Sequence, residues 1–145
     1  MAIITLNNNA LVNADVGKVL QVVSYSLDDS SGISTTSSSY VSTSVTVTLP
    51  SLATTGSKVM LWLTVGETYN APIVALYRDG SLVSNSIAGN AVGGGTGTLS
   101  TSYLDAPNKT TSTTYTVYFK GVGSEVFLKN NSAQSVNFTA MEIGA

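Results

Sequence analysis

The chain has 145 residues, of which 43% are hydrophobic and 10% are charged, and its formal net charge is −2. This length suits one domain with a real core, and high hydrophobicity combined with low charge argues against a disordered chain. The six basic residues are scattered, so they cannot form the dense positive stripe that a nucleic-acid partner requires. Serine and threonine number 40, which indicates a surface kept wet by hydroxyl groups.

The first segment, MAIITLNNNALVNAD, has neither the basic start nor the long apolar stretch of a signal peptide, and no apolar run in the chain approaches the length of a membrane span. We therefore expect a protein made in the cytoplasm, without a membrane partner. We divide the chain into an arm (residues 1–16) and a β-sandwich domain (17–145). The arm is too short to fold alone, and we expect it to dock on a neighbouring subunit or on a capsid through its aliphatic side chains: Ile3, Ile4, Leu6, Leu11 and Val12.

Alternation with a period of two dominates the rest of the chain. In YVSTSVTVTL, Val41, Val45 and Val47 share one side with Leu49, while serines and threonines occupy the other, as in a strand with one buried face. Ser34–Ser39 before it reads as a turn or loop. Asp79-Gly80 is a signal for a type I′ hairpin turn. Further strands are expected at Lys18–Tyr25, Lys58–Val65, Ile73–Arg78, Ser81–Ile87, Thr98–Tyr103, Tyr115–Lys120, Glu125–Lys129 and Val136–Ile143.

These eight or nine short strands, separated by turns and without helical periodicity, predict an all-β fold. We expect an antiparallel two-sheet sandwich of jelly-roll type. The strand Lys58–Val65 is apolar on both sides, because Met60 and Trp62 face away from its valines and leucines. A second cover is then needed. We expect Met60 and Trp62 to lie in a homo-oligomer interface; cover by the glycine loop GNAVGGGTG is the alternative.

Catalytic chemistry finds little support in the composition. The chain contains no histidine and no cysteine, which removes the Ser-His-Asp triad, cysteine catalysis, disulfides and thiolate metal sites. Asp28 and Asp29 lie in a serine- and glycine-rich loop, where they read as solvated turn residues; whether this loop binds an ion stays open. We expect no enzyme, no catalytic residue, no metal and no cofactor.

Aromatic side chains leave one binding function open, because they can stack on sugar rings as well as fill cores. Tyr69 lies in the expected loop GETYNAP and Tyr103 lies beside DAPN, so these two are the candidates for contact with a receptor glycan. The loops Asp28–Ser38 and Ala91–Thr98 would contribute to the same contact.

Several motifs occur together in a recognisable order: GKVLQVVSYS from Gly17, SSSYVSTSVTVTLPSLATTGSKVML, ALYRDGSLV, SYLDAPNKTTSTTYTVYFKG, and FTAMEI near the end. In these the chain resembles small virion surface proteins and fibre-tip domains of tailed bacteriophages, notably phages of marine bacteria. The resemblance covers nearly everything from Gly17 onward. It implies a jelly-roll-like sandwich, often trimeric, on a virion surface, and it does not imply an enzyme. In such a fold the first and last strands pair, which would place Lys18–Tyr25 beside Val136–Ile143.

Our leading expectation is therefore a phage structural protein that decorates the virion as a homo-oligomer, most simply a trimer. Its partners would be itself and the major capsid protein or a tail protein. Fibre-tip domains usually follow a long shaft, whereas sixteen residues precede Gly17 here, which favours attachment through the arm. The alternative is a receptor-binding protein at a tail-fibre tip that recognises a host surface glycan.

Overall fold

A computed structural model describes residues 17–28, 32–88, 95–129 and 135–145 of the chain. These residues form ten β-strands and no helix, which confirms the all-β prediction. The strands are β1 (Val19–Leu27), β2 (Ile33–Thr35), β3 (Val41–Leu49), β4 (Lys58–Tyr69), β5 (Ile73–Arg78), β6 (Ser81–Ala88), β7 (Thr96–Asp105), β8 (Thr113–Lys120), β9 (Val126–Lys129) and β10 (Val136–Ile143).

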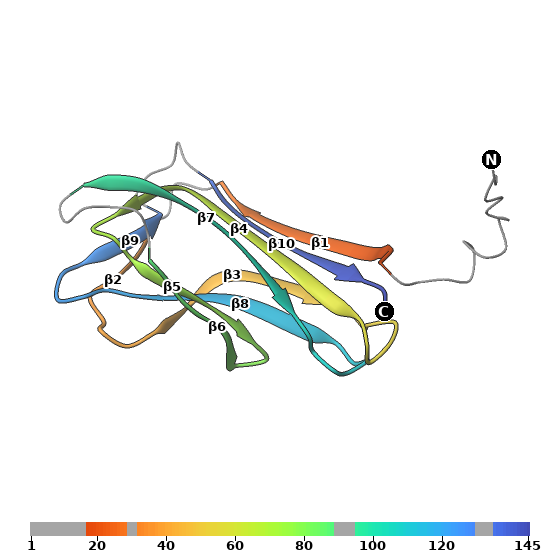
Figure 1. The fold of residues 1–145 in the computed structure, drawn as a ribbon. Helices are drawn as coiled ribbons and strands as arrows, with labels where there is room; N and C mark the ends of the chain where they lie inside the picture. Colours follow the sequence, from red (N-terminus) through yellow and green to blue (C-terminus); the bar gives the residue numbers. More distant parts are fainter. Residues whose placement is uncertain (1–16, 29–31, 89–94, 130–134) are drawn as a thin grey trace, which may run out of the picture.

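The strands pair in a nested order around the turn between β5 and β6. β5 pairs with β6, β4 with β7, β3 with β8, β2 with β9 and β1 with β10, always antiparallel. The chain is thus one long antiparallel ribbon rolled into two sheets, which is the jelly-roll arrangement. One sheet contains β1-β10-β4-β7, and the other has the order β3-β8-β5-β6. Figure 1 shows these as upper and lower layers, with β2 and β9 at one end.

The core lies between the two layers, and the alternation expected from the sequence builds it. On β3, Val45, Val47 and Leu49 are buried while Thr46 and Thr48 are exposed. β4 contributes Val59, Leu61, Leu63 and Val65 from the facing sheet, and all four are at most 2% exposed. The larger side chains that close the core include Tyr115, Phe119 and Phe138.

The pairing of the first and last strands is also confirmed. β1 runs antiparallel to β10 from Val19↔Ile143 to Leu27↔Val136. Beyond the strands, the Gly17 N–H donates a hydrogen bond to the Gly144 oxygen (2.7 Å), and the Gly144 N–H donates one to Lys18 (2.8 Å). The point where the arm would leave the domain therefore lies beside the C-terminal end of β10.

The turn prediction is confirmed as well. Asp79 and Gly80 have φ angles of 48° and 81°, so both central residues occupy the left-handed region that a type I′ turn requires. Arg78 and Ser81 pair directly on either side of the turn.

Two local predictions were wrong. The expected turn or loop Ser34–Ser39 begins within a strand, because Ile33–Thr35 finds a partner in β9. The strand that was expected to end at Val65 continues to Tyr69. Its extension is stabilised by two partners distant in sequence, since Thr68 pairs with Gly97 on β7 and Tyr69 with Phe127 on β9. Tyr69 is therefore a strand residue, not a loop residue.

Candidate interaction surface

The outer face of the β1-β10-β4-β7 sheet carries a continuous row of apolar side chains. The register pairs Val22 with Met141, Met141 with Met60, and Met60 with Leu104, so one residue from each of the four strands lies in line. At ~4.8 Å between neighbouring strands, this row is about 14 Å wide. Trp62 lies two residues after Met60, on the same face of β4. We call Val22, Met60, Trp62, Leu104 and Met141 the apolar patch.

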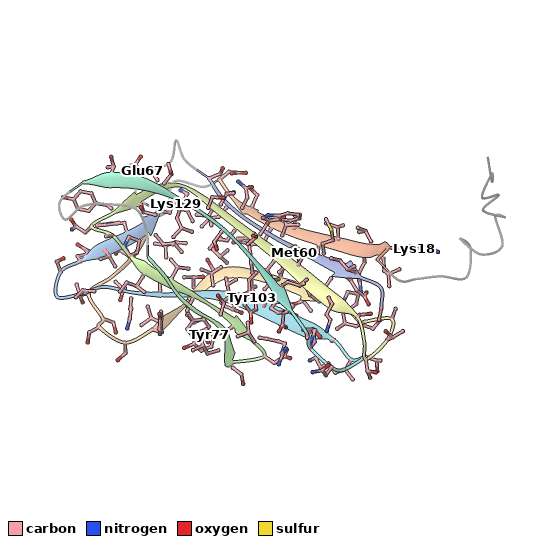
Figure 2. All side chains as sticks on the ribbon, viewed as in Figure 1. Lys18, Met60, Glu67, Tyr77, Tyr103 and Lys129 are labelled. Carbon is pink, nitrogen blue, oxygen red and sulfur yellow. The ribbon has the colours of Figure 1, made fainter. Side chains whose placement is uncertain are left out.

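None of the described residues covers the apolar patch, which is therefore partly exposed to solvent. Val22 is 51% exposed, Leu104 is 50% and Trp62 is 45%, while the two methionines are half-buried. Figure 2 labels Met60 on the upper layer, to which β4 belongs. Exposing such large side chains together is unfavourable, and burying the exposed half of each would contribute on the order of 1 kcal/mol.

The apolar patch has different surroundings on its two sides. On one side lies the exposed Lys58, two residues before Met60 on the same face of β4 and paired with Ile143, and on the other side the surface is polar but uncharged. The next cross-strand row contains Ser24, Thr139, Trp62 and Ser102, and the row after it contains Ser26, Asn137, Thr64 and Ser100. No charged side chain occurs in these rows or in the apolar row. A partner can therefore cover these three rows without desolvating a charge, which is the most costly group to bury, provided that Lys58 stays at the edge of the contact.

The sequence identified only part of this surface. Met60 and Trp62, the predicted interface residues, lie together on it as outward residues of β4. Val22, Leu104 and Met141 were missed. Each of these three residues follows the alternation of its own strand, and that alternation indicates only which residues of the strand share a face. Their alignment with Met60 depends on the register of four strands that are distant in the chain, and this has no local signal.

The candidate glycan residues lie apart from each other. Tyr103 pairs with Leu61 and packs half-buried against the core, on the inner side of β7. Tyr69 makes an edge-to-face contact with Phe127, with 6.0 Å between the ring centroids. The two tyrosines correspond to positions eight residues apart along β4, a separation of about 26 Å. They do not form one site.

Other predicted residues fall partly outside the described part of the chain. This holds for the arm residues Ile3, Ile4, Leu6, Leu11 and Val12, for Asp29, and for the first half of the loop Ala91–Thr98, whose second half belongs largely to β7. Asp28 is exposed, and its carboxylate accepts hydrogen bonds from the Ser26 hydroxyl at 3.0 and 2.9 Å.

A buried polar network links the two sheets. Arg78 on β5 donates to both carboxylate oxygens of Asp105 on β7, at 2.9 and 2.7 Å, and the Tyr115 hydroxyl on β8 donates to the same carboxylate at 2.8 Å. Burial raises the pKa of Tyr115, and its hydrogen bond to Asp105 raises it further, so the hydroxyl stays a donor. Every group has a partner, which fits a structural role.

Chemical sites are not evident in the described residues. They contain no group of three or more acidic, histidine or cysteine side chains that could hold a metal ion, and they enclose no pocket. None of the described segments is a helix with the length and apolarity needed to cross a membrane.

Comparisons with known proteins add little. No family model and no curated protein matches the chain. Among solved structures, the chain is similar to dimeric latent PorU from Porphyromonas gingivalis, with a TM-score of 0.47 and 13% sequence identity. The similarity covers 86% of this chain and 13% of the PorU chain. A likeness of this size says nothing about what the chain does.

Proposed function

We propose that the protein is a structural component of a bacteriophage virion, displayed on the particle surface as a homo-oligomer. The observation that carries the proposal is the uncharged apolar patch on one sheet of a jelly-roll sandwich. The sequence motifs that resemble phage surface proteins support the virion assignment, and they favour a trimer. The protein would be made in the host cytoplasm and assembled onto the particle.

A second copy of the same chain is the partner that best suits the apolar patch. In a symmetric oligomer, a charged side chain that lies close to the symmetry axis comes near its own copies and is repelled by them. The three rows from Val22 to Ser26 avoid this, because they contain only apolar, hydroxyl and amide groups. An apolar, uncharged centre with a polar border that includes Lys58 also matches the usual composition of a subunit interface.

Attachment to the particle is assigned to residues 1–16 in this proposal. Their apolar residues Ile3, Ile4 and Leu6 would bind the major capsid protein or a tail protein. In each subunit the attachment segment would leave the domain where β1 begins, beside the end of β10. The symmetry of the oligomer would then place these segments at equivalent positions around its axis.

The test is the copy number of the chain per purified virion, relative to the major capsid protein, by quantitative mass spectrometry. We expect a ratio within a few-fold of the capsid protein, and we expect particles assembled with a chain lacking Met1–Asp15 to lose it. A low but reproducible copy number would instead indicate a tail position and favour receptor binding. Absence from purified virions would refute the proposed function.

A further inference from the structure

The outer face of the second sheet, β3-β8-β5-β6, carries a group of three tyrosines. Tyr77 on β5 and Tyr118 on β8 stack with ring centroids 3.9 Å apart and an angle of 21° between planes. Tyr40, which precedes β3, meets Tyr77 edge-on at 6.2 Å. The Lys120 ammonium lies 4.7 Å from the centre of the Tyr40 ring. We call Tyr40, Tyr77 and Tyr118 the tyrosine cluster; Figure 2 labels Tyr77 on the lower layer.

The tyrosine cluster is not part of the core. On β8 the inward residues are Tyr115, Val117 and Phe119, whereas Tyr118 belongs to the outward set with Thr116. All three rings of the cluster are only half-buried, so part of each remains at the surface. Leu82, which pairs with Tyr77, is 46% exposed and extends the apolar surface towards β6.

Hydroxyl groups border the cluster. Ser42 pairs with Tyr118, and Thr116 pairs with Tyr77. Thr116 also shares a hydrogen bond with Thr46 (3.1 Å), so the hydroxyl border continues onto β3. The surface thus combines aromatic rings, a lysine and hydroxyl donors and acceptors, all on sheet strands.

This combination matches the chemistry of a sugar. A pyranose ring has an apolar C–H face that packs on an aromatic ring, and its edge carries hydroxyls that bond to serine, threonine or lysine. Binding surfaces of other proteins often combine the same two residue types, because tyrosine provides a large rigid contact area and serine provides hydrogen bonds that adapt to the ligand. The stacked rings restrict each other before any ligand arrives, which lowers the entropy cost of binding.

One atom of the cluster is not optimised for stability. The Tyr40 hydroxyl is buried and has no hydrogen-bond partner among the described residues. An unsatisfied buried hydroxyl costs about 1–3 kcal/mol, and departures of this kind concentrate at functional sites.

We propose that the tyrosine cluster is a carbohydrate-binding site that takes an oligosaccharide. The site lies on the sheet opposite the apolar patch, so a subunit could be covered on one face and bind glycan on the other. The inference goes beyond the proposed function and moves glycan recognition from Tyr69 and Tyr103 to different residues. It does not require a virion, because it concerns the isolated protein.

The test is binding of the full-length chain to a printed array of bacterial, algal and animal oligosaccharides. The strongest binder is then titrated against ¹⁵N-labelled protein. We expect shifts in amide resonances of β5 and β8, and we expect Tyr77→Leu and Tyr118→Leu each to weaken binding about tenfold. Leucine keeps apolar cover over the sheet, and melting temperatures near that of the wild type confirm that both variants fold.

Val122→Ser is the control and should bind the oligosaccharide as the wild type does, since Val122 is 74% exposed and lies between β8 and β9, outside both the tyrosine cluster and the apolar patch. The proposal is overturned if the array retains no protein, or if both leucine variants bind undiminished. Loss of oligomer mass with Tyr118→Leu would also overturn it, because the cluster would then be a subunit contact. None of these results depends on the copy number per virion.

Discussion

At the scale of single residues, Asp105 shows how a sandwich with few charged residues can bury a carboxylate. Its side chain is 7% exposed and accepts hydrogen bonds from Arg78 and Tyr115, which come from the other sheet. A buried carboxylate is tolerated only when charge and hydrogen-bonding capacity are both matched. The network therefore fixes the position of β7 relative to β5 and β8.

We predict that Tyr115→Phe lowers the free energy of unfolding by about 1.5–3 kcal/mol, the usual worth of a hydrogen bond to a charged group. The substitution keeps the ring in the core and removes only the hydroxyl. Urea unfolding measures the change. Tyr25→Phe, which removes a hydroxyl from a half-buried tyrosine outside the network, is the control; an equal loss in both variants would contradict the prediction.

At the scale of elements, Glu142 ties β10 to its surroundings. Its carboxylate accepts hydrogen bonds from the Ala53 N–H and from the Gln21 side chain, both at 2.6 Å. Burial by itself would raise the pKa of Glu142, but these hydrogen bonds, with one from Ser57, outweigh burial and lower it. The glutamate thus links β10, β1 and the segment between β3 and β4 in its ionised form.

The sign of this pKa change sets the acid response. A carboxylate whose pKa is lower in the folded than in the unfolded state stabilises the fold at pH values above its pKa in the unfolded chain, which is ~4.3. This stabilisation is lost as the pH falls to the pKa of the carboxylate in the folded state. We predict that Glu142→Gln costs about 1–3 kcal/mol at pH 7, and that its difference from the wild type shrinks below about pH 4. Unfolding curves across this range test it, with the exposed Glu125→Gln as control. A difference that does not change with pH would refute it.

At the scale of the whole molecule, the inner faces of both sheets are apolar, whereas the two outer faces differ in chemical composition. One sheet presents the apolar patch and the other presents hydroxyls around the tyrosine cluster. In the proposed oligomer the first face is covered and the second stays in water. The jelly-roll order makes this division possible, since it brings β1, β10, β4 and β7 into one layer (Figure 1).

We predict that light scattering gives a multiple of the 14.9 kDa subunit mass. We also predict that Trp62→Ser and Leu104→Ser each weaken association at least tenfold, because every subunit of the oligomer loses on the order of 1 kcal/mol of apolar burial. Val122→Ser is the control, since Val122 is 74% exposed and lies between β8 and β9, outside the apolar patch. A 14.9 kDa wild-type particle at micromolar concentration would refute self-association.

Local patterns in the sequence were enough to predict most of the strands and the inner face of each. The alternation in Val41–Leu49 and the Asp79-Gly80 turn are local patterns, because side-chain direction has a period of two and a type I′ turn depends on two residues. The same patterns placed Met60 and Trp62 outward on β4. What they could not determine was which strands would become neighbours.

The composition of the two outer surfaces depends on how the whole chain packs. Met60 meets Val22, Met141 and Leu104 through pairings that join residues up to 119 positions apart, from Val22 to Met141. The length of β4 to Tyr69 and the strand Ile33–Thr35 depend likewise on β7 and β9. Tyr40, Tyr77 and Tyr118 come together for the same reason. A strand's backbone groups are satisfied by whichever strand lies beside it, so register and neighbours follow from packing the whole chain.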